Sequence, residues 1–78
     1  MNDFAKVLGA NIKLLRVKKD LTQQEVAVSA NITPSYLSRI EKGGIATSVE
    51  KLCRIAQAMD CEPAELLPDF EFMDSIDR

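Results

Sequence analysis

The sequence has 78 residues, of which 46% are hydrophobic and 28% are charged, and its net charge is −2. This length allows one domain with a modest core, and no apolar run approaches the roughly 18 residues that a membrane span needs. The first residues lack the basic segment and apolar block of a signal peptide, so we expect a cytoplasmic protein that does not bind membranes.

The cysteines give no sign of a metal site. Cys53 and Cys61 fit no metal-ligand spacing, and the chain has no histidine to complete such a site. We expect no metal and no other cofactor, a reduced environment, and Cys53 as a core residue. The sequence leaves open whether Cys61 is partly exposed.

The charges are divided unevenly along the chain. Residues 1–59 carry nine Lys or Arg and five Asp or Glu, whereas residues 60–78 carry seven acids and one Arg. A basic body with an acidic tail suits a protein that turns one face to DNA. The alternative is that the acidic tail merely keeps the protein soluble.

In chain order, the first expected helix covers about residues 3–19. Phe4, Leu8, Ile12 and Leu15 recur at the spacing of one helical face, and Asn2 or Asp3 can cap its start. Lysines at 18 and 19 suit the negative end of the helix dipole, with phosphate contact as the alternative.

Two short helices with a tight turn between them are expected over residues 22–41. Thr22 and Glu25 form a capping box at the start of the first, over about 22–30. Asn31 lies where the chain must reverse, and asparagine tolerates a left-handed backbone. Thr33 and Pro34 start the second, over about 34–41, and the glycines at 43 and 44 end it.

A fourth helix is expected to run to about residue 59, with a capping box of Thr47 and Glu50 at its start. Its inward face would hold Val49, Leu52, Ile55, Ala56 and Met59. Lys51 would be exposed. A short fifth helix is expected over about residues 63–67, with proline at its first position and Pro68 ending it.

The segments LTQQEVA at 21–27 and SYLSRIEKG at 35–43 resemble the helix-turn-helix of the phage-repressor (Cro/cI, Xre-type) family of DNA-binding proteins. The resemblance extends over about residues 8–67. It implies an all-α, compact five-helix, lambda-repressor-like domain over residues 1–67, in which helices 2 and 3 form the helix-turn-helix. Repressors of this family place the second helix of the motif in the major groove of DNA.

The resemblance also implies roles for three residues that support the third helix. In the family, an arginine like Arg16 commonly forms an ion pair with a glutamate like Glu41, which would tie helix 1 to helix 3. A glutamine like Gln23 contacts the DNA backbone and braces the recognition helix. The alternative for Gln23 is a solvated side chain in the first helical turn.

The third helix is expected to enter the major groove of double-stranded DNA. Arg39 can donate hydrogen bonds to both O6 and N7 of one guanine. A phosphate contact or a surface ion pair are the alternatives. Lys42 suits a phosphate, and the Tyr36 hydroxyl could reach one although its ring suits packing. The expected DNA-binding residues are Gln23, Thr33, Pro34, Ser35, Tyr36, Ser38, Arg39 and Lys42. Pro34 cannot donate a hydrogen bond, which leaves the operator sequence open.

Residues 68–78 form an acidic tail that is unusually rich in large apolar groups for a disordered segment. The tail could fold back on its own core or pack on a second copy. We expect a dimer contact that includes Leu67, Phe70, Phe72, Met73 and Ile76.

These features favour a sequence-specific transcription regulator that binds a palindromic operator as a homodimer, such as an autoregulatory controller of a restriction–modification system. The alternative is an antitoxin or adaptor whose main role is to bind a protein partner. An enzyme is least expected, because neither cysteine has a visible activator and no phosphate-binding glycine loop stands out. No small-molecule ligand is expected.

Overall fold

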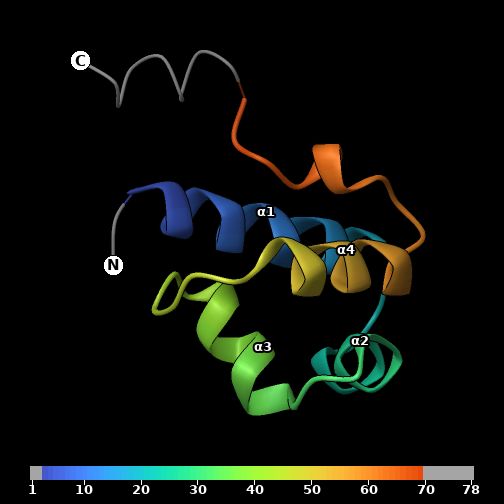
Figure 1. Cartoon of the computed structure of the whole chain (residues 1–78). Coiled ribbons are helices and arrows are strands. Elements are labelled where there is room, and N and C mark those ends of the chain that lie inside the picture. Colours follow the sequence, from blue (N-terminus) through green and yellow to red (C-terminus); the bar gives the residue numbers. More distant parts are fainter. Residues whose placement is uncertain (1–2, 70–78) are drawn as a thin grey trace.

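The computed structural model describes residues 3–69, which fold into four α-helices and one short 3-10 turn (Figure 1). The helices are α1 (Asp3–Lys18), α2 (Gln23–Ala30), α3 (Pro34–Glu41) and α4 (Val49–Ala58), and the 3-10 turn is η1 (Pro63–Glu65). The described residues contain no strand. Within this part of the chain, no helix is long and apolar enough to cross a membrane.

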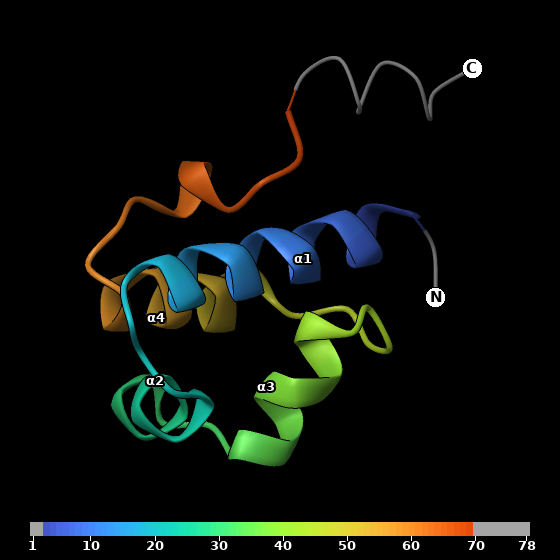
Figure 2. The ribbon, with the colours of Figure 1, turned by 180° about the vertical axis from the view of Figure 1, so that it is seen from behind.

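The four helices surround one apolar core. α1 packs chiefly against α3, and α2 packs against both α3 and α4. Both α2 and α3 lie on one side of α1 and α4, while the segment after α4 passes α1 on the opposite side (Figures 1 and 2). The largest fully buried side chains come from every one of these parts: Ile12, Val26, Leu37, Ile40, Ile55, Met59 and Leu66.

The caps of α2 and α3 match the sequence prediction. At the start of α2, the Glu25 amide donates to Thr22 Oγ1 at 3.0 Å, and the Thr22 amide donates to Glu25 Oε1 at 2.9 Å. At the start of α3, the Tyr36 amide donates to Thr33 Oγ1 at 3.0 Å. Asn31 has the expected left-handed backbone, with φ of 59°. The turn between α2 and α3 therefore follows from local chemistry.

The expected fifth helix is wrong, because residues 63–65 form only the 3-10 turn η1. The Glu65 amide donates to the carbonyl of Glu62, and the Leu66 amide donates to that of Pro63, both at 3.0 Å. Pro68 follows before a second turn could form, so there is no room for the bonds of an α-helix. Leu66 is nevertheless fully buried and closes the core.

The start of α4 also differs from the expectation. Ser48, not Thr47, is the N-cap, and its hydroxyl accepts a hydrogen bond from the Lys51 amide at 3.1 Å. Val49 was expected in the core but is 77% exposed, because no described element covers the first turn of α4. Cys53 is exposed as well, so its prediction as a core residue is wrong.

Candidate nucleic-acid interface

The C-terminal end of α3 presses directly on α1. Gly9 on α1 faces the backbone of α3, and a Cβ atom there would clash with the Ile40 carbonyl oxygen and come within 2.8 Å of the Glu41 oxygen. Only glycine allows two helices to approach so closely at this point. The angle of α3 is therefore set partly by backbone contact with α1.

Three polar side chains from three helices meet at the same place. Arg16 Nε donates to Glu41 Oε2 at 2.7 Å, and its terminal nitrogen donates to Glu41 Oε1 at 3.1 Å. Gln23 Nε2 also donates to Glu41 Oε1, at 2.9 Å. The Glu41 side chain is only 2% exposed, so these donors replace the water that its charge would otherwise need.

The network formed by Arg16, Gln23 and Glu41 also holds the backbone between α1 and α2 in place. A further nitrogen of Arg16 donates to the Leu21 carbonyl at 2.8 Å, which ties down the link between α1 and α2. The structure thus brings together the arginine and glutamate expected to pair, and places the Gln23 amide against the end of α3. We call these three residues the Glu41 network.

The end of α3 is closed by a glycine turn. Gly43 has a left-handed backbone, with φ of 75°. Its amide donates to the Ile40 carbonyl and the Gly44 amide donates to the Arg39 carbonyl, both at 2.9 Å. This pattern is a Schellman motif, which satisfies carbonyls that the helix end would leave unpaired.

The opposite side of α3 projects into solvent. Thr33, Pro34, Ser35, Arg39 and Lys42 are exposed, while Tyr36 and Ser38 are half-buried. Leu37 and Ile40, on the inner side, are fully buried. The residues expected to face DNA therefore form one continuous surface along α3, with Gln23 at the start of α2 beside its C-terminal end.

Lys51, which was expected to be exposed, is half-buried, and it adds a cation to this surface. Its ammonium group lies over the Tyr36 ring, 4.7 Å from the ring centre. Such stacking holds a long lysine side chain in place. The pairing of Lys51 with Tyr36 was not predicted, because the two residues lie on different helices and no local pattern connects them.

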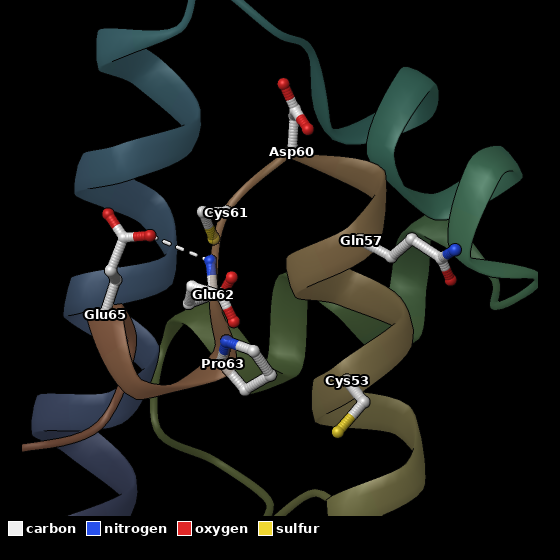
Figure 3. Close-up of a pocket in the computed structure, with 7 residues that line it drawn as sticks. All are labelled: Cys53, Gln57, Asp60, Cys61, Glu62, Pro63 and Glu65. Atoms are coloured by element: carbon white, nitrogen blue, oxygen red, sulfur yellow. Dashed lines mark hydrogen bonds between the residues drawn. The ribbon is translucent and has the colours of Figure 1, made fainter.

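A separate pocket lies between α4 and η1 (Figure 3). Burial, and then the negative charge of Glu65, raises the pKa of the Cys61 thiol, so the thiol stays protonated and is a poor nucleophile. Among the described residues, no group of three or more His, Cys, Asp or Glu side chains is placed to hold a metal ion. The lining consists of Cys53, Gln57, Asp60, Cys61, Glu62, Pro63 and Glu65.

Comparison with known proteins agrees with this geometry. A helix-turn-helix family model matches residues 12–66. The chain is 37% identical over 65 residues to the HTH-type transcriptional regulator y4dJ of Sinorhizobium fredii, covering 83% of this chain and 84% of that protein. It is 33% identical over 72 residues to the control protein C.MunI of a Mycoplasma species, covering 91% and 97%.

A solved structure shows the same arrangement of helices. The crystal structure of the restriction-modification controller protein C.AhdI from Aeromonas hydrophila matches with a TM-score of 0.79 and 30% identity, covering 81% of this chain and 96% of that one. The names of these relatives describe regulatory proteins. The chain belongs to the Xre-type helix-turn-helix family and is a DNA-binding transcription regulator.

Proposed function

We propose that the protein binds a palindromic operator as a homodimer, with α3 of each copy in the major groove. The observation that carries the proposal is the fixed position of α3, whose C-terminal end is held by the Glu41 network while its outer side stays free. A helix held in this way can present side chains to base edges without the entropy cost of ordering the helix on binding.

Within this proposal, Arg39 reads a base and Ser35 supports it. Both side chains are exposed, and their spacing of four residues places them on one face of α3. Arginine bridges guanine O6 and N7 with two hydrogen bonds. Pro34 offers only an apolar contact, while Thr33 and Ser38 flank the same face.

The phosphate contacts would come from the edges of this surface. Lys42 is exposed at the C-terminal end of α3. Gln23 lies in the first turn of α2, where backbone amides favour anions. The Tyr36 hydroxyl would reach a phosphate, with Lys51 stacked on its ring. These contacts position the protein without reading sequence.

We further propose that residues 1–67 form the DNA-binding domain and that residues 68–78 contribute the dimer contact. Leu67, which is 43% exposed, lies just before this segment. Phe70, Phe72, Met73 and Ile76 lie outside the described residues. Similarity to C.MunI and C.AhdI supports a more specific role as an autoregulatory controller of a restriction–modification system.

The test is footprinting of the DNA upstream of the protein's own gene at two salt concentrations. We expect a protected site with two-fold symmetry. Arg39→Ala should cost about 1–3 kcal/mol of binding and relax specificity at one base position. Lys42→Ala should weaken binding to all sequences alike. It should also reduce the slope of the logarithm of the binding constant against the logarithm of salt concentration by about one unit.

Arg54→Ala is the matched control, because Arg54 is a cation on α4 that pairs with Glu50 at 2.7 Å. It should leave the footprint unchanged. Equal weakening of all sequences by Arg39→Ala would reassign Arg39 to a phosphate. No protection by a folded, dimeric protein would instead favour an antitoxin or adaptor that binds a protein partner.

A further inference from the structure

α1 carries an apolar groove on the face that it does not turn to the core. The groove is lined by Ala10, Lys13, Leu14 and Val17, with Glu41 of α3 at its edge. Leu14 is 63% exposed and Val17 is 56% exposed. Ala10, Leu14 and Val17 are spaced at four and three residues, so they share one side of the helix.

No described element covers this groove. In Figure 2, α1 has a face with no other helix in front of it. Large apolar side chains exposed singly are normal, but neighbouring ones along a helix face mark a surface for binding. Lys6 is exposed and lies four residues before Ala10, so it is on the same side of α1 as the groove. This side of α1 is therefore both apolar and basic.

We propose that this groove receives residues 70–78 of a second copy of the chain. That segment, FEFMDSIDR, has four large apolar residues, and it contains three acids and one Arg. Its chemistry complements an apolar groove with Lys6 and Lys13 along it. The proposal rests on the proposed homodimer and names the surface that receives its tail.

The path of the described chain favours the partner's tail over the protein's own. Lys19 Nζ donates to the Asp60 carbonyl at 3.0 Å, and Asn11 Nδ2 donates to the Leu66 carbonyl at 3.1 Å. The segment after α4 therefore runs antiparallel to α1 and heads toward its N-terminal end. The protein's own tail would have to reverse direction to reach Val17.

Exchange of tails between two copies would fill the grooves of both chains at once. In a dimer with two-fold symmetry, each groove takes the other copy's tail. Nine residues span at most about 30 Å when extended, whereas the groove from Ala10 to Val17 covers only about 11 Å of helix. The extended tail is therefore longer than the groove that it would fill.

The experiment is disulfide trapping in the full-length chain, with Cys53→Ser and Cys61→Ala as the background. One chain carries Leu14→Cys and the other carries Met73→Cys. The two are mixed and oxidised, and the linked products are identified by mass. We expect a disulfide between positions 14 and 73, which in this mixture forms only between copies.

The matched control replaces Leu14→Cys with Val28→Cys, a residue on α2 that is 67% exposed. A yield at position 14 no higher than that of the control would overturn the proposal. So would a 14–73 disulfide that closes within one chain carrying both cysteines, because that outcome assigns the groove to the protein's own tail.

Sedimentation separates this proposal from the proposed dimer itself. Leu14→Lys should raise the dimer dissociation constant about tenfold or more, since it removes an apolar side chain that the partner's tail would bury, whereas Val28→Lys should not change it. A stable dimer that is indifferent to Leu14→Lys would refute the groove but leave the homodimer standing. A strictly monomeric wild-type chain would refute both.

Discussion

At its C-terminal end, α3 meets α1 backbone to backbone at Gly9, and its last residue, Glu41, is held by two other helices. At its N-terminal end, α3 has one capping bond from the Tyr36 amide to Thr33, followed by exposed Pro34 and Ser35. The C-terminal end is held by a backbone contact and hydrogen bonds from other helices, whereas the hydrogen bond that caps the N-terminal end is local.

The difference shows how a small domain can hold a helix firmly at one end and still leave its outer side exposed. Contacts that fix the direction of α3 lie on its inner side at the C-terminal end, whereas the side chains proposed to contact DNA lie on its outer side. A change in the Glu41 network should therefore lower stability, whereas a change at Arg39 or Lys42 on the outer side should alter DNA binding.

The largest effect is expected from Arg16→Met. It leaves the Glu41 carboxylate buried without its main partner, which typically costs about 3–5 kcal/mol. Urea denaturation measures the loss. The double variant Arg16→Met with Glu41→Leu should regain much of the stability, because it removes the stranded charge. A loss below about 1 kcal/mol for Arg16→Met would mean that water compensates the charge.

Gly9→Ala should destabilise the protein by about 3 kcal/mol, at the upper end of what overpacking usually costs. The added methyl group meets backbone oxygens of α3, which cannot turn aside as a side chain would. Thermal unfolding measures the change. Gly44→Ala is the control, because its nearest atom would lie 3.5 Å away, an ordinary contact. Equal effects of the two substitutions would show that α1 and α3 can separate freely.

Thr33→Ala tests the local end of α3 and should cost about 1 kcal/mol, the usual value of an N-cap side chain. Thr33→Ser should keep most of this stability, since its hydroxyl can accept the same bond. Denaturant midpoints of the two variants give the comparison. If Thr33→Ala cost as much as Arg16→Met, the two ends of α3 would be equally important for stability.

The smallest expected effect on stability is its pH dependence through Glu25, at the start of α2 beside the Glu41 network. Hydrogen bonds from the Thr22 amide and hydroxyl lower the pKa of Glu25, because they favour its charged form. This contribution to stability is present above the ordinary glutamate pKa of about 4.3 and is lost as the pH falls through the lower, folded-state value.

Glu25→Gln keeps an acceptor for the Thr22 amide but cannot titrate. The variant should therefore lose less stability than the wild type between about pH 6 and pH 3, as measured by urea midpoints across that range. An identical acid dependence in both proteins would show that Glu25 makes no titrating contribution.

Sequence reasoning was most successful where a structure depends on neighbouring residues. Thr22 with Glu25, Thr33 with Pro34, and Asn31 in its left-handed turn are all local signals, and each marks a helix end that the structure has. The apolar spacing of Phe4, Leu8, Ile12 and Leu15 likewise predicted the first helix. The meeting of Arg16 with Glu41 could be expected only from family resemblance, since 25 residues separate them.

The errors occurred where the local signal was ambiguous. Thr47 and Ser48 can both cap a helix, and a choice that is wrong by one residue misplaces its start. Val49 fits the apolar spacing of α4, but only tertiary packing decides whether its first turn is covered. Pro63 suits a helix start, yet the segment before Pro68 proved too short for more than a 3-10 turn.

The burial of Leu66 also bears on the order in which the molecule assembles. The Asn11 side chain donates a hydrogen bond to the carbonyl of Leu66, which lies 55 residues later in the sequence. Contacts between residues so far apart in sequence slow folding, because the loop between them must first be closed. The ribosome adds Leu66 only after all the residues of α1 to α4. The apolar core, which Leu66 closes, can therefore be completed only after residue 66 has been made.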